Sequence, residues 1–420
     1  METQHREWEK LTKQRWWVLI ASCLINLCIG SLYTWSVFSA PMAAYLSELT
    51  GTALTAGDLA IVFTVANSVG PITLISGGFF NDRMGPRWVI FLGGIMFGGG
   101  MFLCGLAGGV SMLILGFGLG CGLAMGLVYG CTVSNSVKFF PDRRGLIGGL
   151  ATATYGIGSV IIPPIATSLI ESAGVTSAFR IFGVIFLVAI CGGSFLVRRC
   201  PEGFTPTGWT PPVKMASACS YDKNWKGMLQ SPEFYVMIFM LTCGAFSGLM
   251  VISQASSMAQ VMAGMTPAAA AVAVSVLALF NGGGRVLAGW LSDRLGRIRT
   301  LQLVFVLYIL GLGLLLITRP GGVSVFYGGM GLVGFCFGAF MGIFPGFTAD
   351  QFGAKHNSVN YGIMFIGFAL AGFFGPLGMN ALYQSSGSYH PAFYLGVTLS
   401  AIGSILTFVY KMVNRAKKIS

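Results

Sequence analysis

Charged residues are scarce in this chain. Only 9% of its 420 residues are Asp, Glu, Lys or Arg, whereas 55% are hydrophobic. A soluble domain normally carries about 25% charged residues. So few charges cannot cover a surface that faces water on all sides. This scarcity excludes an ordinary soluble protein and predicts that most of the outer surface faces lipid.

Potential metal ligands and catalytic groups are also few. The three histidines, His5, His356 and His390, lie near predicted membrane edges, and the ten cysteines are scattered through apolar runs without the paired spacing of a zinc site. An enzyme within the membrane would need a catalytic dyad or metal ligands at depth. We therefore predict no metal, no cofactor and no enzymatic activity, and we interpret the cysteines as small packing residues.

Long apolar runs supply the architecture. A spanning helix needs about 20 mostly apolar residues. The basic N-terminus leads into a long apolar stretch without a cleavage site of small residues, which indicates a first spanning helix and not a signal peptide. We expect twelve spanning helices, at 15–46, 55–80, 88–108, 111–138, 144–171, 175–198, 231–261, 266–291, 299–318, 322–349, 358–384 and 389–412.

Basic residues gather on one predicted face of the membrane. Of the 25 lysines and arginines, all but Arg180, Arg285 and Arg319 lie in the two tails or in the loops after even-numbered helices. The positive-inside rule makes that face cytoplasmic, together with both termini. The net charge of +12 therefore reflects topology and not nucleic-acid binding. Membrane lipid is an expected partner, with anionic lipid possible at 411–418.

Two segments of the chain repeat each other. Residues 78–87 read GFFNDRMGPR and residues 289–299 read GWLSDRLGRIR, each after the second helix of its half. The glycines and prolines of 139–163 and 352–376 also correspond. We expect an N-terminal six-helix bundle (1–198), a polar, Pro-rich cytoplasmic linker (199–230) and a C-terminal six-helix bundle (231–420). Parallel repeats of this kind relate the halves of one large transporter class.

The repeated motif resembles the signature of the major facilitator superfamily, and the resemblance covers essentially the whole chain. It implies an all-α membrane protein with twelve transmembrane helices in two pseudo-symmetric bundles. It also implies that Asp82 and Arg83, with Asp293 and Arg294, act in a cytoplasmic gate. The alternative is that these are ordinary loop charges.

One arginine lies at depth. Arg285 precedes Asp293 by eight residues, roughly 12 Å along a helix, inside a hydrocarbon core about 30 Å thick. A charge there needs a partner or a wet cavity, yet all thirteen acidic residues fall in tails, loops or helix ends. The guanidinium fits a carboxylate with two parallel hydrogen bonds, so we expect it to bind a substrate carboxylate. The alternative is bonding to backbone carbonyls at a kink near 282–284.

A second resemblance concerns the substrate. Leu279-Phe-Asn-Gly-Gly-Gly-Arg285 resembles the eighth helix of the oxalate:formate antiporter family and of the related monocarboxylate transporters, where the arginine binds the substrate carboxylate. Further matches are Tyr33-Thr-Trp35, Val128-Tyr129-Gly130, Tyr155-Gly156 and Asn360-Tyr361-Gly362. The resemblance implies an aromatic cavity around Arg285. Its expected lining is Asn281, Tyr33, Tyr129, Tyr155, Phe337, Tyr361, Phe365 and Phe368.

Two departures from these relatives bear on the substrate. The oxalate carrier has a second cation, a lysine, where this chain has Phe368, so a monocarboxylate such as lactate, pyruvate or formate fits better. Animal monocarboxylate carriers have an aspartate, implicated in proton coupling, where this chain has Asn281, which cannot titrate.

The sequence therefore predicts a secondary transporter of a small organic anion that works by alternating access. Coupling by anion exchange or by proton symport stays open. A dicarboxylate antiporter, a drug exporter and a transporter-like membrane sensor are the alternatives. The family resemblance and the outer loops, which are not rich in glycosylation sites, indicate a bacterial inner membrane. We also expect a monomer.

Overall fold

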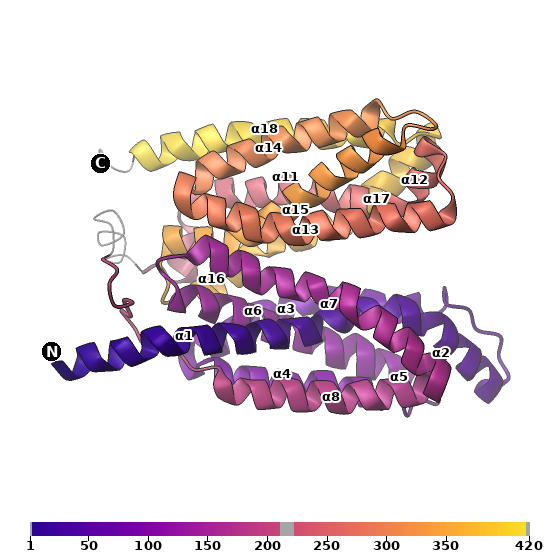
Figure 1. Ribbon diagram of the computed structural model, residues 1–420, viewed down its shortest axis with the longest axis horizontal. Helices are drawn as coiled ribbons and strands as arrows, with labels where there is room; N and C mark the ends of the chain where they lie inside the picture. Colours follow the sequence, from indigo (N-terminus) through magenta and orange to yellow (C-terminus); the bar gives the residue numbers. More distant parts are fainter. Residues whose placement is uncertain (1, 211–221, 417–420) are drawn as a thin grey trace. The chain divides into compact units, whose positions relative to one another are not determined.

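The computed structural model describes residues 2–210 and 222–416. The central part of the predicted linker, with Pro211, Pro212 and Lys214, and the tail lysines Lys417 and Lys418 lie outside the described residues. The described chain is helical, with loops and turns between the helices (Figure 1).

Twelve helical segments in the described residues are long and apolar enough to cross a membrane, which confirms the predicted number. The predicted and observed ends agree to within several residues along most of the chain. The elements that build these segments are α1 (Glu2–Ile29), η1 (Gly30–Thr34), α2 (Trp35–Thr50), α3 (Ala60–Met84), α4 (Pro86–Cys104), α5 (Val110–Leu113), η2 (Ile114–Cys121), α6 (Gly122–Phe139), α7 (Arg144–Ala173), α8 (Val175–Leu196), α11 (Pro232–Ser253), α13 (Pro267–Leu295), α14 (Arg297–Leu316), α15 (Val323–Phe352), α16 (Asn357–Met364), α17 (Ile366–Ser386) and α18 (His390–Ala416). The short helix α12 (Ala255–Ala263) lies between two of the segments.

Several spanning segments are not regular along their length. The first is interrupted by the 3-10 turn η1 between α1 and α2. The fourth contains the π-helical stretch η2, and the eleventh is interrupted at Phe365 between α16 and α17. Irregular turns of this kind are frequent at functional sites in membrane and soluble helices.

The chain forms two compact units. Unit 1 comprises Met1–Asp142, Thr154–Asp222 and Gly353–Gly362; unit 2 comprises Arg143–Ala153, Lys223–Phe352 and Ile363–Ser420. In unit 1, α4 packs along α8 and α3 packs along α6. In unit 2, α13 packs along α15, and α11 packs against α17 and α18. The units are defined by contact, so the repeat boundaries expected from the sequence stay a prediction.

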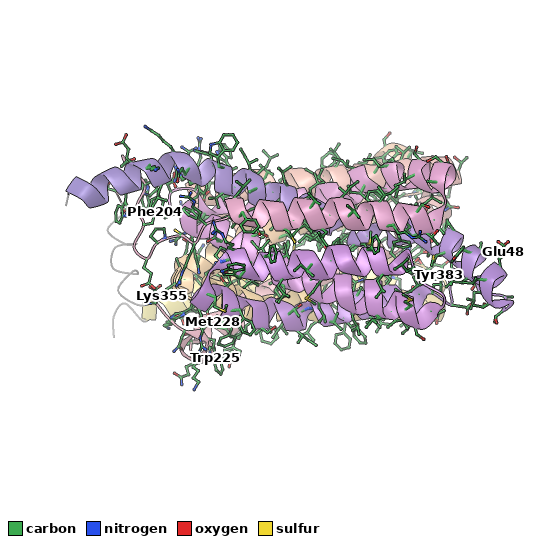
Figure 2. All side chains as sticks on the ribbon, turned by 90° about the horizontal axis from the view of Figure 1, so that it is seen from below. Glu48, Phe204, Trp225, Met228, Lys355 and Tyr383 are labelled. Atoms are coloured by element: carbon green, nitrogen blue, oxygen red, sulfur yellow. The ribbon has the colours of Figure 1, made fainter. Side chains whose placement is uncertain are left out.

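The ends of the helices in each unit carry the loops. In unit 1, Phe204 and Lys355 lie at one end and Glu48 lies at the other (Figure 2). In unit 2, Trp225 and Met228 of the short helix α10 (Trp225–Leu229) lie at one end and Tyr383 lies at the other (Figure 2). Between the ends, outward-facing side chains are apolar, such as Val184 and Val188 of α8, which suits contact with lipid.

Candidate substrate site and gate

Arg285 is buried in α13, with 8% of its surface exposed. Its Nε donates a hydrogen bond to Oδ1 of Asn281, one turn earlier, over 3.1 Å. Its Nη1 donates to the backbone carbonyl of Thr152 in α7 over 2.6 Å. Among the described residues, no carboxylate forms an ion pair with Arg285. A backbone carbonyl does accept from the guanidinium, but it belongs to another helix and not to a kink at Gly282–Gly284, where α13 is continuous.

Close helix contacts hold this part of α13 in place. A Cβ on Gly338 of α15 would meet the carbonyl oxygen of Asn281 at 2.0 Å, and one on Gly342 would meet the carbonyl oxygen of Arg285 at 2.1 Å. From α7, a Cβ on Gly149 would meet the same Arg285 oxygen at 2.0 Å. Only glycine allows backbones to approach this closely, which is a common way for helices to associate in lipid. Arg285 therefore sits where α7 and α15 both press against α13.

The three predicted phenylalanines come together in unit 2. The rings of Phe365 and Phe368 stack with their centroids 4.5 Å apart. The ring of Phe337 lies 6.2 Å from that of Phe368. Phe365 and Phe368 are three positions apart at the start of α17, so they lie on the same side of that helix. The cluster provides an apolar wall.

Three of the predicted tyrosines form a row in unit 1. The ring centroid of Tyr155 lies 5.8 Å from that of Tyr33 and 5.2 Å from that of Tyr129. Tyr33 is 41% exposed, whereas the other two are buried. The η1 turn positions Tyr33, since a Cβ on Gly30 would meet the carbonyl oxygen of Tyr155 at 2.1 Å. Tyr361 is buried in α16, within the segment of unit 1 that comes from the C-terminal half.

Asp293 caps the N-terminal end of α7. Its two carboxylate oxygens accept hydrogen bonds from the backbone N–H groups of Gly145 and Leu146, each over 2.8 Å. It also pairs with Arg297 one turn later at 2.7 Å. The first N–H groups of a helix have no intrahelical acceptor and favour negative charge. The second copy of the repeated motif thus ties the loop end of α13 to the start of α7.

Asp82 occupies the corresponding position in unit 1. Lys138 forms an ion pair with it at 2.7 Å, and the backbone N–H of Val359, near the start of α16, donates to its second oxygen over 3.3 Å. Next to it, Asn81 Nδ2 donates to the Ser358 hydroxyl over 2.7 Å. Both motif aspartates therefore bind the N-terminal end of a helix from the other sequence half.

The motif arginines take a different position from their aspartates. Arg83 and Arg294 are both exposed. The guanidinium of Arg294 lies 4.2 Å from the ring centre of Trp290. In the described residues neither arginine forms an ion pair. Their assignment to the gate stays a prediction.

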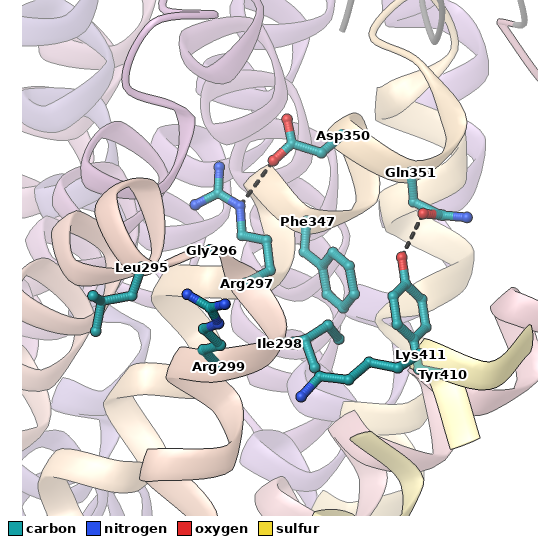
Figure 3. A pocket seen from close by; sticks show the side chains of 10 residues that line it. All are labelled: Leu295, Gly296, Arg297, Ile298, Arg299, Phe347, Asp350, Gln351, Tyr410 and Lys411. Carbon is teal, nitrogen blue, oxygen red and sulfur yellow. Dashed lines mark hydrogen bonds and ion pairs between the residues drawn. The ribbon is translucent and has the colours of Figure 1, made fainter. Parts of the chain in front are cut away.

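The sequence reasoning missed a network of ion pairs beside Asp293. Asp350, at the end of α15, accepts from Arg144 Nη1 over 2.8 Å. It also accepts from Arg297 Nε over 2.8 Å (Figure 3). The sequence places Asp350 in a loop or at a helix end, and it places Arg144 and Arg297 among the basic residues of the cytoplasmic face. Arg144 and Asp350 are 206 positions apart, so nothing local in the sequence indicates their contact. No group of three or more His, Cys, Asp or Glu side chains in the described residues could hold a metal ion.

Known proteins resemble the chain along most of its length. A sequence model described as "Major Facilitator Superfamily" matches residues 23–376 and 263–419. An uncharacterized MFS-type transporter, YhjX, of Escherichia coli K12 is 32% identical over 85% of this chain and 86% of its own. The oxalate:formate antiporter of Oxalobacter formigenes is 28% identical over 97% and 94%. Monocarboxylate transporter 12 of Xenopus laevis is 25% identical over 96% and 90%.

Solved structures share the fold. The crystal structure of the MFS transporter FucP in the outward conformation superposes with a TM-score of 0.70 at 13% identity, over 93% of this chain and 98% of that one. At this identity the likeness concerns the arrangement of helices and not the substrate.

Proposed function

Because the chain belongs to the major facilitator superfamily and is therefore an integral membrane transporter, we propose that it carries a small monocarboxylate of the lactate, pyruvate or formate class. In this proposal the carboxylate binds Arg285. The protein acts as a monomer in a bacterial inner membrane with both termini in the cytoplasm. Coupling is by anion exchange or by proton symport.

The observation that carries the proposal is the chemistry around Arg285. A guanidinium has five N–H donors and no acceptor. Here Nε and Nη1 have neutral oxygen acceptors, and no fixed carboxylate in the described residues balances the charge. Burial of a charge without a counter-charge is unfavourable. A substrate carboxylate would supply both the missing charge and the missing acceptors.

The preference for a single carboxylate rests on the expectation that the phenylalanine cluster of unit 2 lines the site of Arg285. Phe368 stands where the oxalate carrier has its lysine, and it stacks on Phe365 beside Phe337. One cation with an apolar wall suits a single carboxylate on a short apolar body. In the same proposal Asn281 orients the guanidinium. A dicarboxylate would leave its second charge against phenylalanine rings, so we keep an oxalate-type antiporter as the second candidate.

Substrate binding would also act on the gate. The Thr152 carbonyl that holds Arg285 lies eight residues after Arg144, on the part of α7 that packs against α13 in unit 2. A carboxylate that takes two parallel hydrogen bonds from the guanidinium competes with this carbonyl. We infer that binding loosens α7 from α13 and so favours alternating access.

Transport by purified protein in liposomes tests the proposal. The wild type should take up labelled lactate, pyruvate or formate with saturation, and oxalate should compete weakly. Arg285→Lys keeps the positive charge but loses the planar guanidinium, which can donate two parallel hydrogen bonds to a carboxylate. Since a hydrogen bond to a charged group contributes about 1.5–3 kcal/mol, uptake should fall roughly tenfold to a hundredfold. The exposed Arg319 provides the matched control, and Arg319→Lys should transport normally.

Two results would contradict the proposal. Normal uptake by a folded Arg285→Lys variant would show that transport does not require the guanidinium. Failure of the wild type to bind any carboxylate, while its thermal stability stays high, would point instead to a sensor or to a transporter of another substrate class.

A further inference from the structure

A second site with anion-binding chemistry lies away from Arg285, at the loop end of unit 2. A shallow pocket of about 370 Å³ opens between the start of α14 and the ends of α15 and α18 (Figure 3). Its wall is formed by Leu295, Gly296, Arg297, Ile298, Arg299, Phe347, Asp350, Gln351, Tyr410 and Lys411. All of these residues belong to unit 2.

The positive charge of the pocket is only partly balanced. Asp350 is engaged by Arg297 and Arg144, and Arg297 is also paired with Asp293. Arg299 is exposed and has no acidic partner in the part of the chain that the structure describes. Lys411 donates its hydrogen bond to a neutral group, Oε1 of Gln302, over 3.0 Å. Two cations at this pocket therefore lack a counter-charge.

The backbone adds donors at the same place. Gly296, with φ of 88°, is the N-cap residue of α14. Glycine has no side chain that could accept hydrogen bonds from the first N–H groups of the helix. Such N–H groups favour an anion. In Figure 3 the Lys411 side chain extends across the pocket beneath Ile298 and Phe347, toward the side on which Arg299 lies. The N–H groups and both uncompensated cations thus belong to one pocket.

The location favours a lipid over a soluble anion. The pocket lies where three spanning segments end, at Arg297, Phe352 and Asn414. The ends of spanning helices are expected at the level of the lipid headgroups. Leu295, Ile298 and Phe347 give it an apolar side that a free phosphate would not need. Basic pockets between membrane helices on the cytoplasmic side are suited to anionic headgroups.

We propose that this pocket binds the headgroup phosphate of an anionic phospholipid, with Arg299, Lys411 and the N-terminal end of α14 as its ligands. Tyr410, whose hydroxyl bonds to Gln351, forms the back of the site. The site is separate from the transport function and does not depend on which substrate Arg285 binds. Through Asp350 and Arg297 it adjoins the ion pairs that hold the start of α7.

Lipid titration of the purified full-length protein tests the proposal. Native mass spectrometry gives the Kd of dioctanoyl phosphatidylglycerol. The double variant Arg299→Gln with Lys411→Gln should bind roughly 25-fold more weakly, about fivefold for each cation removed. Each single variant should show about a fivefold loss. The matched control is Lys226→Gln with Arg319→Gln, which removes the same charge from exposed positions of unit 2 outside the pocket.

Two further ligands separate the possible sources of the phosphate. Dioctanoyl phosphatidylcholine carries the phosphate but no net charge, so it should bind weakly and similarly to all variants. Glycerol 3-phosphate should compete poorly because it lacks acyl chains. Equal weakening in the control double variant would overturn the proposal in favour of bulk charge. Glycerol 3-phosphate that binds as tightly as the lipid would also overturn it.

Discussion

The guanidinium of Arg285 illustrates what residue chemistry decides in this transporter. Its burial was predictable, because it follows from counting positions along the chain. The structure agrees that no carboxylate of the described residues pairs with it, although one acid, Glu233, is itself fully buried. The Thr152 carbonyl that accepts from it was not predictable, since a backbone oxygen 133 positions away carries no signature in the sequence. Asn281, one turn earlier, was named as a substrate contact; in the structure it accepts from Nε of Arg285 over 3.1 Å.

Asn281→Asp should make substrate binding depend on pH. An aspartate at this position would place a carboxylate beside the guanidinium. Above the pKa of that carboxyl group the fixed charge pairs with Arg285 and competes with the substrate. Below it the acid is neutral and the substrate regains the arginine. Uptake by the variant should therefore rise on acidification, measured in liposomes at equal internal and external pH.

Asn281→Ala is the matched control for this change. It removes the acceptor without adding a titratable group, so its uptake should be lower at every pH but should follow the wild-type pH profile. The same pH profile in Asn281→Asp and Asn281→Ala would show that position 281 does not act on the charge of Arg285.

At the scale of the helices, hydropathy gave the number and approximate ends of the spanning segments, because a lipid core imposes length and composition on each helix separately. The interruptions were not predictable. The η1 turn at Gly30–Thr34 and the π-helical stretch at Ile114–Cys121 lie in apolar runs that read as continuous helix. They depend on neighbouring helices, such as the approach of Gly30 to the Tyr155 carbonyl.

Gly149→Ala should loosen the start of α7 specifically. The added Cβ would lie 2.0 Å from the Arg285 carbonyl oxygen, so α7 and α13 would have to separate. Overpacking of this kind costs about 1–3 kcal/mol. Amide exchange of residues 143–153, followed by mass spectrometry, should accelerate roughly tenfold or more, because 1.4 kcal/mol corresponds to a factor of ten in the opening equilibrium.

Two other glycines of unit 2 make this test specific. Gly342→Ala produces the same clash with the Arg285 oxygen from α15, at 2.1 Å, but α15 packs along α13 inside the bundle, so the main effect should be a lower Tm. Gly313→Ala adds a Cβ with no atom within 4 Å and should change neither quantity. If Gly149→Ala leaves exchange at 143–153 unchanged, the glycine contact does not hold α7.

At the scale of the whole molecule, the internal repeat leads us to expect equivalent structural roles for the equivalent residues of the two sequence halves. The aspartates agree with this expectation, since Asp82 and Asp293 each accept from the first N–H groups of a helix from the other sequence half. The partners of the aspartates break the symmetry: Asp82 pairs with Lys138, whereas Asp293 pairs with Arg297 inside a larger network. A repeat in sequence therefore predicts which aspartates have equivalent helix contacts, whereas their ion-pair partners are known only from the structure.

Exchange should be faster than net uptake in this transporter. When α7 moves away from α13, Arg285 loses the Thr152 carbonyl, and a buried charge with fewer partners costs several kcal/mol. A bound carboxylate replaces the lost acceptor and neutralises the charge, whereas the empty protein has only Asn281 left. Reorientation should therefore be easier with substrate bound than without it.

Counterflow measures this difference directly. Liposomes preloaded with unlabelled lactate should take up labelled lactate several times faster than empty liposomes when no pH gradient is present. Arg285→Lys should lose both uptake and its acceleration by internal lactate, because both depend on the guanidinium of Arg285. Equal rates in loaded and empty liposomes would mean that the empty protein reorients freely, and the anion would then move with a proton on the substrate or on a group outside this site.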